Sequence, residues 1–328
     1  MRLATLRNGT PDGALVVVTA NGLRGLPSGT CLIDAIADWT RMAPSLLALA
    51  ARVESDGTPF DPAHLSAPMP RTWQWLDGSA FATHGELMQA AFHMPPIATD
   101  LPLMYQGMSD RFHGPCDPVP FASEADGIDF EGEFGVIVDA VPMGVTAQRA
   151  AAHIRLIVQI NDWSLRAIAP VEMKTGFGWV QAKPACSMAP FAITPDELRA
   201  QWRDDRVCAN LLVEWNGAWF GLVNGAEMAF SFAELVAHAA RTRDLVAGTI
   251  IGSGTVSNAA YATCGSACIS ERRAIEMIAD GAAQTGFMRF GDTVRMQAQT
   301  SDGRTPFGTI LQSVVGVPTW RSDQAFGF

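Results

Sequence analysis

Two glutamates separated by one glycine, Glu131-Gly132-Glu133, open an apolar, β-branched segment with the sequence GIDFEGEFGVIVDAVP. A β-strand turns successive side chains to opposite faces, so Glu131 and Glu133 would share one face of the predicted strand. Two carboxylates on one face beside apolar residues repel each other and lose hydration unless a cation lies between them. The segment therefore predicts either a divalent metal site in a buried strand or a strand end whose glutamates reach water.

The length and hydrophobicity of the chain are sufficient for a full core, since 48% of its 328 residues are hydrophobic. This size allows one large domain, or one large and one small domain. The chain lacks the run of about 20 apolar residues that a membrane-spanning helix needs, and MRLATLRNGTPDG lacks the apolar core of a signal peptide. We expect a cytoplasmic protein with no membrane partner.

The charge balance is acidic, with 33 acidic residues against 23 basic ones and a net charge of −10. The chain contains no run of Lys or Arg, so nucleic acid is not an expected partner. The six cysteines are scattered, which indicates free thiols rather than a disulfide framework. Cys264 and Cys268 form a CxxxC motif, but no second pair or nearby histidine completes a set of four zinc ligands.

A break rich in proline and polar residues, GTPFDPAHLSAPMPR, divides the chain. It follows a predicted strand in ALVVVTANG and a predicted helix over residues 32–53. We therefore predict a small N-terminal α/β domain over residues 1–70 and a second, larger domain over residues 71–328.

The larger domain is predicted to be rich in strands. Its predicted elements are helices over 83–92, TAQRAAAHIRLI, 232–243 and 272–281, a strand in LIVQINDWS, and hairpins in LLVEWNGAWFGLVNGAEM and GDTVRMQAQTSDGRTPFGTI. Asn216-Gly217 is the turn signal of the first hairpin. Many β segments with few helices between them predict an α+β, β-rich domain built on a mixed, curved sheet.

Two further acids stand at positions where a carboxylate needs an explanation. Asp162 ends the apolar strand of VQINDWSLR, where it is either paired with another group or a solvated strand end that caps a turn. Asp77 precedes His84 by seven residues in WLDGSAFATHG. A helix cap at Asp77 and a half-buried imidazole at His84 are the plainer interpretations of these two residues.

Taken together, the motifs resemble the fumarylacetoacetate hydrolase family from about residue 70 onward. The EGE pair, NDWS, the DxxxxxxH element, YQG, the lysine of QAKP and GSGTVSN all occur here, in the order that this family uses. The resemblance implies a distorted mixed β-roll, the C-terminal domain type of that family, and a homodimer. It also implies that residues 71–328 are the catalytic domain.

The resemblance also implies a set of site residues. A Mg²⁺ or Ca²⁺ ion, with Mn²⁺ as a further possibility, would be held by oxygen ligands, which suit hard cations. The implied metal ligands are Asp77, Glu131, Glu133 and Asp162. The implied catalytic residues are His84 as base, Glu271 as its carboxylate partner and Lys183, and the implied substrate-binding residues are Tyr105, Gly254 and Thr255.

Two departures from the family pattern concern the substrate. The mammalian-type enzyme has arginine where this chain has His93, and glutamine where it has Ala169. We assign His93 to the substrate site, although histidine cannot reproduce the bidentate fork with which arginine holds a carboxylate.

The expected substrate is a diketo acid, either fumarylacetoacetate or a close acylpyruvate. The expected activity is metal-dependent C–C bond hydrolysis in aromatic catabolism, tyrosine degradation included. Two alternatives stay open: a 2-oxo acid decarboxylase, isomerase or hydratase that uses the same metal–enolate site, and a non-catalytic dicarboxylate-binding protein.

Overall fold

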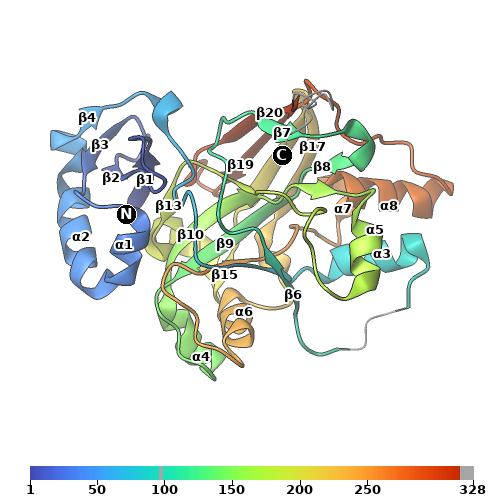
Figure 1. The fold of residues 1–328 in the computed structure, drawn as a ribbon, viewed down its shortest axis with the longest axis horizontal. Helices are drawn as coiled ribbons and strands as arrows, with labels where there is room; N and C mark the ends of the chain where they lie inside the picture. Colours follow the sequence, from blue (N-terminus) through green and yellow to red (C-terminus); the bar gives the residue numbers. More distant parts are fainter. Residues whose placement is uncertain (96–98, 318–328) are drawn as a thin grey trace, which may run out of the picture.

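The computed structural model describes residues 1–95 and 99–317 (Figure 1). Its largest sheet has eleven strands, ordered β4-β3-β2-β1-β13-β10-β9-β18-β5-β6, with β12 paired to β10 outside this path. These strands are β1 (Arg2–Leu6), β2 (Ala14–Val18), β3 (Arg24–Pro27), β4 (Thr58–Pro59), β5 (Trp75–Ser79), β6 (Leu103–Gly107), β9 (Gly132–Val138), β10 (Ile154–Asn161), β12 (Ser187–Met188), β13 (Ala192–Ile193) and β18 (Ile250–Gly252).

A second sheet has five strands in the order β17-β16-β19-β20-β7. They are β7 (Val119–Phe121), β16 (Asn210–Trp215), β17 (Ala218–Asn224), β19 (Thr293–Gln299) and β20 (Ile310–Gly316). One buried apolar cluster contains side chains of both sheets, among them Val136 and Val213, so the two sheets share a core. Two short ribbons pair β8 (Ile128–Asp129) with β11 (Ser164–Leu165) and β14 (Trp202–Arg203) with β15 (Arg206–Val207).

The helices lie around the sheets (Figure 1). The α-helices are α1 (Leu32–Ala37), α2 (Trp39–Asp56), α3 (Ala82–Phe92), α4 (Ala147–Ala150), α5 (Ala169–Thr175), α6 (Phe232–Ala239), α7 (Tyr261–Cys264) and α8 (Ile269–Asp280). The 3₁₀ turns are η1 (Pro62–His64), η2 (Glu124–Asp126), η3 (Ala151–His153), η4 (Pro195–Gln201) and η5 (Gly225–Glu227). None of the helices described is long and apolar enough to span a bilayer.

The N-terminal strands and helices form one end of the molecule (blue in Figure 1). The single helix predicted over residues 32–53 is wrong in one respect, because Asp38 leaves the helical conformation (φ −127°, ψ 46°) and separates α1 from α2. The break lets side chains of both helices, such as Ile36 and Leu46, pack in one apolar cluster with the strands. Strand β1 then pairs with β13, so the N-terminal strands continue the large sheet.

The helix predicted over TAQRAAAHIRLI is also partly wrong. Helical turns end at His153, and β10 begins at Ile154. The apolar residues that follow pair with β9, for example Ile157 with Val136. Their β-branched side chains fit a sheet buried on both faces, and this long-range pairing overrides the local helical pattern.

The α+β, strand-rich class is confirmed. Most neighbouring strands are antiparallel, whereas β18–β5 and β20–β7 are parallel, so the sheets are mixed. The hairpin predicted around Asn216-Gly217 is β16–β17, and both turn residues have positive φ (52° and 76°). The second predicted hairpin is β19–β20.

Strand order brings distant acids to one region of the large sheet. Glu133 lies in β9, and Asp162 directly follows the adjacent β10. On the other side of β9, β18 pairs with β5 and aligns Gly252 with Asp77. The sheet therefore gathers carboxylates that are separated by tens of residues in the sequence.

Candidate active site

Three buried carboxylates form the centre of the candidate site. Asp77, Glu133 and Asp162 each offer one carboxylate oxygen, and these atoms all lie within 4.8 Å of one another. All three side chains are buried, and Glu133 and Asp162 have no exposed surface (0%). Three acids at this separation match the donor set of a hard divalent cation.

The electrostatics of this group reflect crowding of like charges. Burial, followed by repulsion from neighbouring carboxylates, raises the pKa of Asp77 and of Glu133 well above the usual values. Asp77 Oδ1 accepts a hydrogen bond from the Gly254 amide at 3.0 Å. Within the described residues, neither carboxylate oxygen of Glu133 has a hydrogen-bond partner. A buried carboxylate without a donor is costly, so this group is suited to a cation.

Glu131 occupies a different environment from the other predicted ligands. Its carboxylate accepts hydrogen bonds from Ser164 Oγ (2.5 Å), Arg166 Nη2 (2.8 Å), Lys183 Nζ (2.6 Å) and the Thr255 hydroxyl. Burial alone would raise the pKa of Glu131, but the charges of Arg166 and Lys183 hold it far below its usual value. The role of Glu131 as a metal ligand stays a prediction.

Lys183 joins Glu131 to the cluster of three carboxylates. Its Nζ lies 2.6 Å from Asp162 Oδ2 as well as 2.6 Å from Glu131 Oε1. Burial lowers its pKa, but the two carboxylates outweigh burial and the pKa is raised above its usual value. Asp162 also accepts bonds from the Tyr105 hydroxyl (2.5 Å) and Cys186 Sγ (2.9 Å). Lys183 is therefore a fixed cation in this site.

A histidine–carboxylate pair bridges two packed helices. His84 lies in the first turn of α3, and its Nδ1 is 2.9 Å from Glu271 Oε2 in the first turn of α8. Glu271 is fully buried, whereas the His84 side chain keeps 18% of its surface exposed. Within the described residues His84 is hydrogen-bonded only through Nδ1, which leaves its second ring nitrogen, Nε2, available for proton exchange with a bound molecule. The two residues assigned from the family resemblance are thus in contact.

The remaining predicted residues are placed as follows. Gly254 and Thr255 follow β18, and both contact the carboxylates. The Gly254 amide donates a hydrogen bond to Asp77, and the Thr255 hydroxyl donates one to Glu131.

His93 is the exposed C-cap of α3, with a left-handed backbone (φ 51°, ψ 37°). It lies nine residues after His84 at the opposite end of the helix, about 13 Å along its axis. Ala169 is half-buried at the start of α5. The substrate role of His93 stays a prediction.

Two residues of the site were missed by sequence reasoning. Arg166 donates from Nε to Asp129 Oδ2 and from Nη2 to Glu131 Oε1, both at 2.8 Å. Asp129 is fully buried. A signal for Asp129 was available, since Asp129, Glu131 and Glu133 recur at every second residue and so suggest three acids on one side of the strand.

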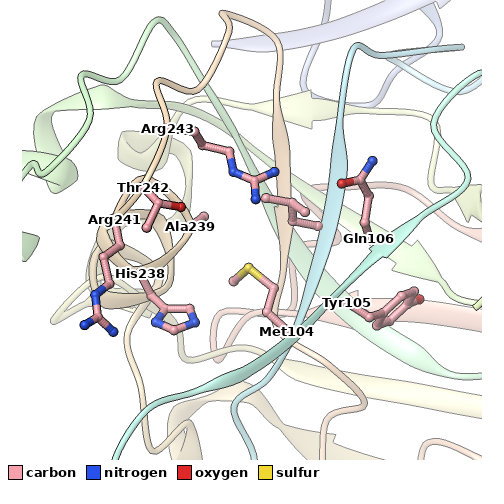
Figure 2. A pocket seen from close by; sticks show the side chains of 9 residues that line it. Met104, Tyr105, Gln106, His238, Ala239, Arg241, Thr242 and Arg243 are labelled. Carbon is pink, nitrogen blue, oxygen red and sulfur yellow. The ribbon is translucent and has the colours of Figure 1, made fainter. Parts of the chain in front are cut away.

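A separate pocket is lined by residues of β5, β6 and the segment 238–243 (Figure 2). Register pairs Asp77 with Tyr105 and Leu76 with Gln106, so alternation places the two pairs on opposite faces. Leu76, Tyr105 and Gln106 are among the residues that line the pocket, which has a volume of about 320 Å³, but the ring of Tyr105 points away from it in Figure 2. The cluster of three carboxylates therefore lies on the opposite face of the sheet from this pocket.

Comparison with sequence families agrees with this arrangement. The model of the fumarylacetoacetate (FAA) hydrolase C-terminal domain matches residues 74–315. The chain belongs to the fumarylacetoacetate hydrolase family. The model of fumarylacetoacetase N-terminal domain 2 matches residues 1–71.

One curated relative aligns with part of this chain. A 2,4-didehydro-3-deoxy-L-rhamnonate hydrolase from Sphingomonas sp. (strain SKA58) is 26% identical over 163 residues, which is 49% of this chain and 54% of that protein. The chain thus aligns with about half the length of that curated relative.

Solved structures share the fold of the family at low sequence identity. The structure of maleylpyruvate hydrolase from Sphingobium sp. SYK-6 in complex with manganese (II) ion and pyruvate has a TM-score of 0.67 at 17% identity. The alignment covers 97% of this chain and 100% of the hydrolase chain. The 5-carboxymethyl-2-hydroxymuconate delta-isomerase from Mycobacterium smegmatis has a TM-score of 0.61 at 19% identity, with the same coverage. The fold predicted from the resemblance is therefore confirmed.

The residues of this chain fit a divalent metal ion. The carboxylate oxygens of Asp77, Glu133 and Asp162 converge, and both oxygens of Glu133 lack a partner within the described residues. The donors are all oxygens, which favours Mg²⁺, Ca²⁺ or Mn²⁺ over zinc.

The raised pKa values lead to a prediction about stability. Carboxyl groups whose pKa is higher in the folded than in the unfolded chain stabilise the fold at low pH, and this contribution is lost as pH rises through the folded pKa. For Asp77 and Glu133 the loss begins near their usual values of 3.8 and 4.5. A bound cation removes the repulsion, so we expect the rise in Tm on adding Mn²⁺ to grow as the pH is raised above about 5. Thermal unfolding with and without Mn²⁺ checks this, and a rise in Tm that does not change with pH would contradict it.

Gly254 gives a second prediction, because its backbone has φ +75° and a Cβ there would lie 2.4 Å from the Gly78 carbonyl oxygen. We expect Gly254→Ala to lower the free energy of unfolding by about 1–3 kcal/mol. Gly286→Ala is the matched control, since its added Cβ meets nothing within 4 Å. Urea unfolding measures both variants, and equal stabilities would refute the strain.

Proposed function

We propose that this protein is a metal-dependent hydrolase that cleaves a C–C bond of a diketo acid, either fumarylacetoacetate or an acylpyruvate, in the breakdown of aromatic compounds. The observations that carry the proposal are the His84–Glu271 pair (2.9 Å) and the three convergent buried carboxylates. The two are linked through Cys268, which bridges to Glu131 and accepts a hydrogen bond from the Glu271 amide. Membership of the family supports an enzyme with a metal–enolate site. The homodimer stays a prediction.

The cation is the electrophilic part of the proposed site. Held by Asp77, Glu133 and Asp162, it would act as a Lewis acid that polarises the attacked carbonyl and stabilises enolate charge. A hard cation in this site would also favour carbonyl and carboxylate oxygens of a substrate as ligands. A β-diketo acid has such oxygens.

The protein residues would supply the proton transfers. His84 would accept a proton from water through Nε2, while Glu271 holds Nδ1 and fixes the orientation of the ring. Lys183 has three N–H donors, of which two are used by Glu131 and Asp162. The third would stabilise negative charge on a substrate oxygen. Water adds to the carbonyl, the C–C bond breaks, and the departing carbanion takes up a proton.

Isomerisation or decarboxylation is the second candidate, because both would use the same carboxylates to stabilise an enolate. The fold likeness to a delta-isomerase keeps this candidate open. A base paired with a buried carboxylate favours hydrolysis, which requires activation of water. The same pair argues against a binding protein without catalysis.

The test is a product analysis with purified protein. Chelated protein is supplied again with Mg²⁺ or Mn²⁺ and incubated with fumarylacetoacetate and with short acylpyruvates. Hydrolysis predicts two carboxylic acids in equal amounts, such as acetoacetate with fumarate. Release of CO₂, or an isomer of unchanged mass, would instead establish the second candidate.

A further inference from the structure

We infer that Asp129 is a positioning residue that anchors the N-terminus of α8. This anchor aligns Glu271 and His84 with the cluster of three carboxylates. This inference rests on the proposed function, because it assigns the alignment of the proposed base to a residue outside the substrate site. Asp129 belongs to β8 and is fully buried, and it is 140 residues away in sequence from the helix that it contacts.

The contacts of Asp129 with α8 are direct. Its Oδ1 accepts a hydrogen bond from the Ile269 amide at 2.7 Å, and its Oδ2 accepts one from the Ser270 amide at 2.9 Å. These amides are the first two of α8, and the third, that of Glu271, is 3.3 Å from Cys268 Sγ. The first amides of a helix have no partner within the helix and carry its positive dipole end, so a buried carboxylate binds them strongly. Asp129 therefore fixes where α8 begins.

Asp129 is also tied to the carboxylate region. Arg166 links Asp129 Oδ2 to Glu131 Oε1, with both distances 2.8 Å. The backbone follows the same path, since the Gly132 amide donates to the Ala267 carbonyl at 2.9 Å. Through Glu131, this chain of contacts reaches Lys183. The start of α8 and the predicted metal ligands are thus parts of one buried network.

The geometry of the base depends on this anchor. Glu271 is the third residue of α8, and its Oε2 is bonded to His84. Its other oxygen, Oε1, has no hydrogen-bond partner within the described chain. No side chain described besides His84 thus orients this carboxylate, and its position follows that of the helix terminus. A displacement of about 1 Å in such a group can lower a rate by about a hundredfold.

The test is a double-mutant cycle of Asp129→Asn and Glu271→Gln on the diketo acid that the wild-type protein cleaves. The asparagine keeps the shape but puts an NH₂ group where a carboxylate oxygen accepts from an N–H. We expect Asp129→Asn to lower kcat by about 10- to 100-fold, with KM and the Mn²⁺ Kd within about twofold of wild type. In the Glu271→Gln background the same change should lower kcat by less than about threefold.

A matched control is Asp139→Asn. Asp139 also accepts bonds from an arginine and a histidine, Arg155 and His153, but it follows the far end of β9. Asp139→Asn should leave kcat unchanged. An unaltered kcat in Asp129→Asn, or an equal loss of kcat with and without Glu271, would overturn the inference. If Asp129→Asn does not fold, Asp129→Glu, which keeps the charge but shifts the carboxylate, must give the same kcat-specific loss.

A readout without turnover separates this inference from the proposed function. Hydrogen exchange of the Ile269 and Ser270 amides should be at least about tenfold faster in Asp129→Asn than in wild type. If the wild-type protein cleaves no diketo acid, the proposed function fails while faster exchange still supports the anchor. Unchanged exchange at both amides would refute the anchor whatever the activity.

Discussion

Replacement of His84 by asparagine is expected to lower kcat for C–C bond hydrolysis by about 10²- to 10⁴-fold. The amide keeps a polar side chain in the first turn of α3 but cannot accept a proton from water near neutral pH. The Mn²⁺ affinity should stay within about twofold of wild type, because His84 does not belong to the cluster of three carboxylates that would bind the ion. Steady-state kinetics and metal titration measure the two quantities independently.

His153→Asn is the matched control for this variant. His153 also pairs through Nδ1 with a carboxylate, Asp139 at 2.7 Å, and is partly exposed like His84, but it lies outside the site. The control should keep wild-type kcat. A His84→Asn protein that hydrolyses diketo acids at the wild-type rate would remove His84 from the mechanism. Loss of hydrolysis with retained decarboxylation would move the assignment to the second candidate.

Replacement of Glu133 by glutamine is expected to abolish metal-dependent turnover and to weaken Mn²⁺ binding by at least about a hundredfold. The amide is the same size but has no negative charge, and only one of its two terminal atoms can bind a cation. Without metal, the variant should be at least as stable as wild type. The reason is that the substitution removes one of three crowded, buried carboxylates and leaves no positive partner unpaired.

Calorimetric titration with Mn²⁺ and thermal unfolding of the chelated proteins check both parts of this prediction. Glu214→Gln is the control, since Glu214 pairs with Arg295 at 2.6 Å in the second sheet. It should leave Mn²⁺ binding unchanged. Undiminished Mn²⁺ affinity in Glu133→Gln would show that the ion is held elsewhere.

The central part of the site was predictable from the sequence because its signals are local. Alternation along a strand brought attention to Glu133, and an acid at the end of an apolar strand did so for Asp162. The pairing of His84 with Glu271 could not come from spacing alone, since 187 residues separate them. It followed from the family resemblance, and the packing of α3 against α8 places the two in contact.

The environments of the acids were not predictable. Period-two spacing treats Glu131 and Glu133 as equals, yet four donors surround the first and none of the described donors bonds the second. The difference arises because β9 begins at Gly132, so Glu131 instead bridges to Cys268 and lies near Arg166. Tertiary contact, which spacing does not encode, separates the two roles.

The misplaced elements have the same cause. In TAQRAAAHIRLI the alanines favour helix, and helical turns do form up to His153. Ile154 and the residues after it instead complete the large sheet against β9. Local preference is weaker than the burial gained in a sheet, so the boundary between helix and strand was decided by pairing.

Isotope incorporation from water tests the central claim most directly. The chelated protein, supplied again with Mn²⁺, is incubated with a diketo acid in H₂¹⁸O, and the products are analysed by mass spectrometry. Hydrolysis predicts one ¹⁸O atom in the newly formed carboxylate, only when metal is present, and none above background with His84→Asn. Complete consumption of the substrate with no ¹⁸O in a product carboxylate would contradict hydrolysis and establish isomerisation or decarboxylation at this site.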